Sequence, residues 1–512
     1  MSRAIVVLSL IIGLSLPGGA IAQSPPERAA PGRAAAPAEQ PATLPPEARA
    51  DHVLNLPGRT LRFSSATGAI RLANAETGAP RADIAYVAYR LSDADKATRP
   101  VAFVFNGGPG YASAWLQLGA LGPWRLPMAD EASRRPSAPP TLVDNADTWL
   151  DFADLVFIDP PGTGFSRVLG GEEGRKALWS VNGDVAVMAE AIRRWSEAND
   201  RVASPKFLVG ESYGGFRAPK IARALQTDQG LGVAGMALIS PALDFQVLRQ
   251  PGSILGLAGA LPSFAAARLE RDLDGKRALN RDDLREVEAY ASGPFILDLI
   301  KGPNDAAAVA RIATRVAAFT GLDPALVARL GGRVTPDLFA REFQRDAGLV
   351  SSVYDANVGG YNPTPFATRG LPDDQMRVGF HAPMTEAMMD VYRNRLHWVV
   401  EGGRYQFFNE RAAEQWDYGR RPPEAVSDLR EALALDPGLR VLVAHGFTDL
   451  ATQYFSTKLT LDQMPRVGPE TGPDKSRDRV LFRVYPGGHM IYARDATRAA
   501  FRADARELFG GR

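Results

Sequence analysis

The strongest chemical signal in the sequence is a serine in a glycine-rich turn. Ser212 lies in the motif Gly-Glu-Ser-Tyr-Gly, which follows the apolar run 207–209 and precedes a stretch of helical pattern. A tight strand-to-helix turn needs small residues beside the serine, and it lifts the hydroxyl toward a base. Backbone N–H groups at the start of the helix favour negative charge that develops nearby. The pattern predicts that Ser212 is a nucleophile; the alternative is a glycine-rich turn with a solvated serine.

A base and an acid follow the serine along the chain. His489 lies in a Pro-Gly-Gly-His turn after a late β-prone stretch, and Asp449 follows an earlier apolar run. A neutral imidazole can take the hydroxyl proton, and a buried carboxylate fixes the tautomer of the imidazole. The order Ser212, Asp449, His489 is the order of α/β-hydrolases. His445 would break this order and is expected to serve packing or to line the pocket, and Asp159 comes too early and is expected to be structural.

A second glycine-rich segment, Asn-Gly-Gly-Pro-Gly at 106–110, follows another β-prone stretch. Acyl transfer needs two N–H donors for the oxyanion, and the residue after the nucleophile commonly supplies one of them. We therefore expect the backbone N–H groups of Tyr213 and Gly108 to form an oxyanion hole. A nucleotide-binding loop is the rival interpretation, but the segment lacks both GxxxxGK[ST] and a full GxGxxG.

These residues need a sheet to position them. Strand-like runs alternate with helical patterns between 155 and 239, which predicts βαβ units and a largely parallel sheet. Between 60 and 105, short β-prone stretches separated by turn-like pairs such as Thr67-Gly68 predict an antiparallel opening. The predicted fold class is α/β: a mostly parallel central sheet flanked by helices, with a mainly helical cap insertion. The expected parts are a signal peptide at 1–22, a Pro/Ala-rich disordered linker at 23–50, the hydrolase core at 51–248 and 440–512, and the cap at 249–439.

The N-terminus predicts export. Arg3 precedes the apolar run 4–16, and Ala-Ile-Ala at 20–22 is typical of a signal-peptidase site. An uncleaved anchor is disfavoured because it needs about 17–25 apolar residues. The mature protein is expected in the periplasm or outside the cell, with no membrane partner after cleavage.

Composition excludes several classes of function. The 512 residues include 59 Lys+Arg against 58 Asp+Glu, so no strong field favours nucleic acid. The chain has no cysteine, and its five histidines are dispersed without a ligand pattern, so no metal and no cofactor are expected. The oligomeric state stays open, with a homodimer among the possibilities.

Together these motifs resemble the serine carboxypeptidases, the S10 peptidase family, in its bacterial branch. Members hold the C-terminal carboxylate of a peptide with an asparagine and two glutamates, one of which needs a raised pKa to keep a shared proton. The resemblance implies an α/β-hydrolase fold and a peptide substrate. Its blocks are Asn-Gly-Gly-Pro-Gly at 106–110, Leu-Val-Phe-Ile-Asp-Pro-Pro-Gly-Thr-Gly-Phe-Ser at 155–166, Gly-Glu-Ser-Tyr-Gly-Gly at 210–215, Gly-Phe-Thr-Asp at 446–449 and Gly-Gly-His-Met at 487–490. It implies the triad Ser212, Asp449 and His489, the oxyanion hole of Gly108 and Tyr213, and carboxylate binding by Asn106 and Glu211.

The sequence departs from the family pattern at substrate recognition. The second glutamate corresponds to Ala120 and a tryptophan to Val104, so carboxylate binding is expected to be weakened, re-routed or absent. Tyr111 and Phe447 replace a cysteine and an aspartate, and these two changes are expected to be structural.

Two consequences follow from the missing glutamate. Arg125 or Arg217 is a candidate substitute partner for the carboxylate, although a surface charge is the more common role of a single arginine. Glu211 no longer shares a proton with a second carboxyl, so the pH optimum is expected to move toward neutrality. An optimum near about pH 4–5 would count against this expectation.

The sequence thus predicts an exported serine-type carboxypeptidase that acts through an acyl-enzyme. The alternatives are an esterase or a proline-type aminopeptidase of related fold, an acyltransferase, and a binding protein without activity, against which the intact triad argues.

Overall fold

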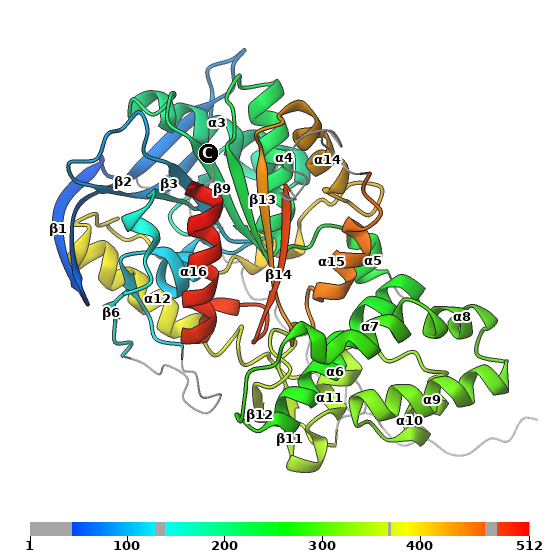
Figure 1. Cartoon of the computed structure of the whole chain (residues 1–512). Helices are drawn as coiled ribbons and strands as arrows, with labels where there is room; N and C mark the ends of the chain where they lie inside the picture. The colour runs from blue at the N-terminus through cyan, green and yellow to red at the C-terminus, as the bar shows by residue number, and fades with distance from the viewer. Residues whose placement is uncertain (1–42, 129–138, 251, 367–369, 466–478, 511–512) are drawn as a thin grey trace, which may run out of the picture. The chain divides into compact units, whose positions relative to one another are not determined.

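The computed structural model describes residues 43–128, 139–250, 252–366, 370–465 and 479–510 (Figure 1). The predicted signal peptide and residues 23–42 of the predicted linker lie outside this part. The described chain from Leu44 onward belongs to one compact unit. Its first strand, β1, begins at Ala48, inside the segment that the sequence predicts to be a linker.

A large sheet forms the centre of this unit. Its order is β1-β2-β3-β7-β4-β9-β10-β13-β14, with β8 beside β3. The strands from β1 to β7 in this order pair antiparallel, and those from β7 to β14 pair parallel. The predicted mostly parallel α/β sheet is therefore confirmed. The strands are β1 (Ala48–Leu56), β2 (Arg59–Ala73), β3 (Pro80–Leu91), β4 (Val101–Phe105), β7 (Asp154–Ile158), β8 (Arg167–Val168), β9 (Lys206–Glu211), β10 (Gly235–Ile239), β13 (Arg440–Gly446) and β14 (Val480–Tyr485).

The pair Thr67-Gly68 is not a turn. Both residues lie inside β2, where they pair with Val87 and Tyr86 of β3. A Cβ on Gly68 would lie 3.2 Å from the Cβ of Glu47, so the glycine makes room for the chain that enters β1. The local turn prediction is wrong because pairing on both sides of β2 outweighs local preference.

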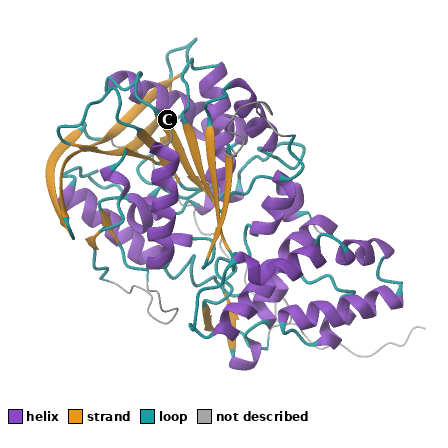
Figure 2. Ribbon diagram, viewed as in Figure 1, coloured by secondary structure: helices purple, strands orange, loops and turns teal. Residues whose placement is uncertain are grey.

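Helices cover both faces of the sheet (Figure 2). Val104 of β4 faces the core that contains α12 and α16, whereas Phe103 and Phe105 face the core that contains α3, α4 and α14, as the period of two in a strand requires. The helices are α1 (Ala114–Leu116), η1 (Gln117–Leu121), α2 (Gly171–Leu178), α3 (Val181–Ala198), α4 (Tyr213–Thr227), α5 (Phe245–Arg249), α6 (Ile254–Leu273), α7 (Arg285–Ala291), α8 (Pro294–Lys301), α9 (Ala306–Thr320), α10 (Pro324–Arg329), α11 (Pro336–Glu342), α12 (His381–Asp390), η5 (Val391–Arg395), α13 (Glu410–Glu414), α14 (Val426–Leu435), α15 (Tyr454–Leu461) and α16 (Asp495–Gly510).

The segment predicted as a cap, 249–439, divides into two parts. Helices α6 to α11 share a hydrophobic cluster, which also takes in Leu450 and Phe455 from the segment that follows β13. By contrast, α12 and α14 supply residues to the two cores on the sheet faces. Only the first part of the insertion therefore has a hydrophobic cluster apart from the two sheet faces, and its role as a cap stays a prediction.

Candidate active site

Ser212 occupies the sharp turn between β9 and α4. Its φ is +61° and its ψ is −121°, in the left-handed region that side chains rarely adopt. A Cβ on Gly210 would lie 2.1 Å from the carbonyl oxygen of Gly214, so this turn needs glycine on the strand side. The backbone N–H of Ser212 donates to the carbonyl of Ile239 at 2.9 Å and ties the turn to the neighbouring strand β10.

His489 and Asp449 form a buried pair at the same edge of the sheet. Asp449 follows β13 and His489 follows β14. Nδ1 of His489 lies 2.8 Å from Oδ2 of Asp449, and the other carboxylate oxygen accepts the backbone N–H groups of Ala451 and Thr452 at 2.7 and 3.0 Å. Burial disfavours the imidazolium, but Asp449 outweighs burial and raises the pKa of His489 above its ordinary value.

Thr452 joins this pair, although no sequence motif points to it. Its Oγ1 lies 2.7 Å from Oδ2 of Asp449, 3.1 Å from Nδ1 of His489 and 2.9 Å from the carbonyl oxygen of Ser240. The hydroxyl therefore braces both groups against β10. The only feature of the sequence that could have pointed to Thr452 is its position three residues after Asp449.

The glycine-rich loop lies directly on the serine turn. A Cβ on Gly107 would come within 2.4 Å of the backbone nitrogen of Tyr213 and 2.8 Å of that of Gly214. Gly108 has φ +108° and lines the same pocket as Ser212 and Tyr213. The two N–H groups expected to bind an oxyanion therefore belong to backbone segments that touch.

Glu211 is buried beside Ser212, with its carboxylate held by two donors. Nδ2 of Asn106 donates to Oε2, and the hydroxyl of Tyr492 donates to the same oxygen at 2.8 Å. Burial raises the pKa of Glu211 to about 7, against the opposing effects of nearby His489 and the two hydrogen bonds. Tyr492 is a second residue that the sequence analysis missed.

The structure also shows the position of Ala120, which corresponds to the second glutamate of the family pattern. Ala120 is buried, and its carbonyl accepts a hydrogen bond from Nδ2 of Asn145 at 2.8 Å. A Cβ on the preceding Gly119 would lie 2.5 Å from the ring of Tyr492. A glycine next to Ala120 thus gives Tyr492 the space to reach Glu211.

Neither arginine proposed from sequence lines the pocket. Arg217 is fully buried and pairs with Asp184 at 2.5 Å. It also donates to the carbonyl of Asn106 at 2.6 Å, so it stabilises the backbone of a pocket residue from outside the pocket. Arg125 pairs with Asp495 at 3.5 Å. The prediction that Arg125 or Arg217 takes the place of the glutamate is therefore wrong, because each side chain forms an ion pair outside the pocket.

The two remaining candidates are buried in the core. His445 packs near the ring of Phe482 at 5.9 Å, and burial lowers its pKa to about 4. Asp159 accepts the N–H of Ser113 at 2.8 Å. Neither lines the pocket, so the packing role expected of His445 and the structural role expected of Asp159 agree with their positions.

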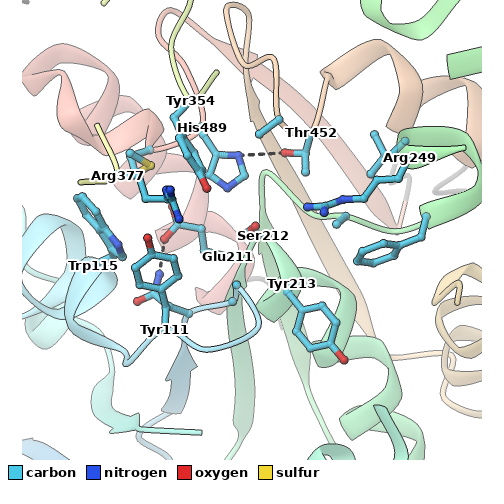
Figure 3. A pocket seen from close by; sticks show the side chains of 18 residues that line it. Tyr111, Trp115, Glu211, Ser212, Tyr213, Arg249, Tyr354, Arg377, Thr452 and His489 are labelled. Atoms are coloured by element: carbon cyan, nitrogen blue, oxygen red, sulfur yellow. Dashed lines mark hydrogen bonds between the residues drawn. The ribbon is translucent and has the colours of Figure 1, made fainter. Parts of the chain in front are cut away.

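Ser212, His489, Thr452, Glu211, Asn106 and the glycine-rich loop line one pocket (Figure 3). Ser212 and His489 lie near its middle, and aromatic rings make up much of its wall. Among the described residues, no group of three His, Asp or Glu side chains is arranged to hold a metal ion. The same part of the chain contains no helix with the length and apolar character of a membrane span. The lining residues are Asn106, Gly107, Gly108, Tyr111, Trp115, Glu211, Ser212, Tyr213, Ala242, Phe245, Leu248, Arg249, Tyr354, Arg377, Ala451, Thr452, His489 and Met490.

Comparison with known proteins agrees with the family resemblance. The family model described as serine carboxypeptidase matches residues 62–246. The pheromone-processing carboxypeptidase kex1 of Talaromyces marneffei is 34% identical over 122 residues, which cover 23% of this chain and 17% of the relative. Serine carboxypeptidase-like 36 of Arabidopsis thaliana is 28% identical over 157 residues, which cover 29% of this chain and 30% of the relative. The chain thus spans less than a third of these relatives' length.

A solved structure shares the fold. The crystal structure of Kex1(delta)p, a prohormone-processing carboxypeptidase from Saccharomyces cerevisiae, matches with a TM-score of 0.52 at 15% identity. The match covers 88% of this chain and 91% of that one. The predicted α/β-hydrolase fold is confirmed, whereas the bacterial branch of the family stays a prediction.

Proposed function

We propose that this chain, whose residues 62–246 match the family model described as serine carboxypeptidase, is an exported enzyme that removes C-terminal residues from peptides. The observation that carries the proposal is the shared pocket. Ser212 and His489, which is paired with the buried Asp449, border the same space as Asn106 and Glu211. Hydrolysis and recognition of a terminal carboxylate therefore have their groups side by side.

In this account His489 activates Ser212. Nδ1 of His489 is engaged by Asp449, which leaves Nε2 to take the hydroxyl proton. Oγ of Ser212 attacks the carbonyl carbon of the last peptide bond, and negative charge develops on the carbonyl oxygen. The N–H groups of Gly108 and Tyr213 receive that oxygen.

The tetrahedral intermediate then collapses. His489 returns its proton to the nitrogen of the leaving amino acid, the C–N bond breaks, and an acyl-enzyme remains on Ser212. Water, deprotonated by His489, hydrolyses this ester and yields a shortened peptide with a new carboxylate. No cofactor is needed for these steps.

Asn106 and Glu211 hold the substrate's carboxylate on the leaving-group side. A protonated Glu211 can donate a hydrogen bond to a carboxylate, whereas an ionised one repels it. The pKa of Glu211, raised by burial to about 7, keeps the donor form available up to neutral pH.

Purified protein tests the proposal with N-blocked dipeptides that carry either a free or an amidated C-terminus. The free acid is expected to have the higher kcat/KM, and Ser212→Ala is expected to abolish turnover of both. Equal or faster turnover of the amide, or hydrolysis of simple esters alone, would favour an esterase or another related hydrolase instead.

A further inference from the structure

Two arginines line the pocket without an acidic partner. Neither Arg249 nor Arg377 forms an ion pair with any carboxylate in the described part of the chain, and each guanidinium instead lies over an aromatic ring. Arg249 lies 5.6 Å from the centre of Phe245, and Arg377 lies 5.9 Å from that of Phe408. A guanidinium in an aromatic-lined pocket is a ready partner for an anion.

The acid nearest to Arg377 in sequence is already satisfied. Oδ1 of Asp374 accepts the hydroxyl of Ser352 at 2.9 Å and the N–H of Met376 at 2.9 Å, and Oδ2 accepts the N–H of Val353 at 2.8 Å. Oδ1 also accepts the backbone N–H of Arg377 at 3.2 Å, and none of these hydrogen bonds involves the guanidinium. Asp374 therefore shapes the loop that presents Arg377.

Arg377 lies on the same side of Ser212 as Glu211. Figure 3 shows Arg377, Tyr111 and Glu211 on one side of the serine and Arg249 on the other. Tyr111 lines the same pocket. Burial raises the pKa of its phenol; the charge of Glu211 adds to this effect and the charge of Arg377 opposes it.

We infer that Arg377 pairs with the C-terminal carboxylate of the substrate and, together with Asn106, carries the anion recognition that Ala120 leaves vacant. The inference rests on the proposed function. A guanidinium remains charged at every working pH and binds a carboxylate with two parallel hydrogen bonds. Glu211 alone cannot do so once it ionises, and Tyr492, which replaces a carboxyl as the partner of Glu211, carries no positive charge.

Arg249 provides a matched control. It carries the same charge in the same pocket and lies over a ring in the same way, but it is on the other side of Ser212. Removal of Arg249 should change the acyl side of the site, where Tyr213 and Phe245 lie, and should leave the preference for a free carboxylate unchanged.

The experiment compares Arg377→Ala, Arg377→Lys and Arg249→Ala on paired substrates: one N-blocked dipeptide as the free acid and as the amide, and the ester of the same acyl group. Arg377→Ala is expected to lower kcat/KM for the free acid by about tenfold or more, mainly through KM, because a charge-assisted hydrogen bond is lost. Turnover of amide and ester should stay near wild type, Arg377→Lys should recover part of the loss, and Arg249→Ala should keep the wild-type ratio of acid to amide.

Two results would overturn the inference while the proposed function survives. In the first, the acid-to-amide ratio of Arg377→Ala equals that of wild type. In the second, Arg377→Ala loses acid, amide and ester turnover to the same degree, which indicates a structural role. A wild-type enzyme that shows no preference for the free acid would overturn both the inference and the proposed function.

Discussion

Glu211 shows at the scale of single residues how this site differs from the expected one. It receives its second side-chain hydrogen bond from Tyr492, 281 positions away, and not from a carboxyl near position 120. The sequence predicts Ser212, Asp449 and His489 by motif and order, because each follows a strand at one edge of a parallel sheet. Thr452 and Tyr492 each lie three residues after a triad member but belong to no motif, and the contact of Tyr492 with Glu211 depends on packing between distant segments. Arg377 has no signal in the sequence at all, because only the fold brings its segment to the pocket.

The pH dependence of carboxypeptidase turnover should report Glu211. His489 must be neutral to act as base, and its pKa is raised, so activity is lost as the pH falls through that pKa. Glu211 loses its proton as the pH rises through about 7, so kcat/KM for free acids should fall there while ester turnover does not. The expected optimum is near neutrality, and an optimum near about pH 4–5 would contradict the account.

Tyr492→Phe should shift the alkaline limb. The phenol donates to the carboxylate of Glu211 and favours its charged form, so removal of the hydroxyl raises the pKa of Glu211. The limb for free acids should move to higher pH by roughly half to one pH unit, the equivalent of one hydrogen bond. Tyr454→Phe, which removes a phenol bonded to Glu288 in the cap region, is the control and should leave the pH profile unchanged.

Thr452 should act through the orientation of His489. Thr452→Val removes the hydroxyl that contacts Asp449 and His489 and keeps the shape of the side chain. We expect kcat to fall about threefold to tenfold with little change in KM, because the hydroxyl orients Asp449 and His489 and does not itself bind the substrate. Thr452→Ser should retain most of the activity. A wild-type kcat for Thr452→Val would mean that Thr452 contributes only to packing and does not orient His489.

Among the structural elements, the contact between the loop at Gly107 and the turn at Ser212 determines the geometry of the site. The alternation of strands and helices predicts the parallel sheet, but it predicts neither the strand that runs through Thr67-Gly68 nor the division of the insertion. Both depend on which distant element is available for pairing or burial. The approach of Gly107 to the serine turn is likewise invisible in the sequence, although the glycines that permit it are not.

Gly107→Ala tests this contact between loops. An added Cβ would meet the backbone nitrogen of Tyr213 at 2.4 Å, so the loop or the turn must move and the two N–H donors separate. We expect kcat to fall about 100-fold or more, as when one oxyanion donor is removed. Gly232→Ala is the control, because a Cβ there meets nothing within 4 Å and the φ of Gly232 is not positive. Equal activity of the two variants would show that the contact of the loop with the serine turn is not needed for catalysis.

In the molecule as a whole, one ion-pair network connects α6 of the predicted cap to the segments that carry Asp449 and His489. Arg494 pairs with Glu270 of α6 at 2.6 Å and with Asp355 at 3.2 Å. Asp355 in turn accepts the hydroxyl of Thr448, the neighbour of Asp449, at 2.7 Å. The side chains of Arg494 and Glu270 are 27% and 17% exposed, so screening by water is incomplete.

Glu270→Ala should therefore loosen the cap. The expected loss is about 1–3 kcal/mol of unfolding free energy, less than for a fully buried pair and more than for a surface pair. Thermal unfolding measures this loss, and kcat should fall with it because Arg494 lies near His489 in sequence. Glu286→Ala, which breaks an exposed pair with Arg315, is the control and should change neither quantity. Equal melting temperatures for the two variants would contradict a role of the network in cap docking.

Cleavage of peptides from the C-terminus by Ser212 is the activity on which the other predictions about turnover depend. The most direct test is mass spectrometry of an unblocked peptide of mixed sequence incubated with purified protein and with Ser212→Ala. The wild-type protein should give a ladder of products shortened one residue at a time from the C-terminus, and the variant should leave the peptide intact. Shortening from the N-terminus, internal cleavage, or an unchanged peptide in the presence of active ester hydrolysis would contradict it.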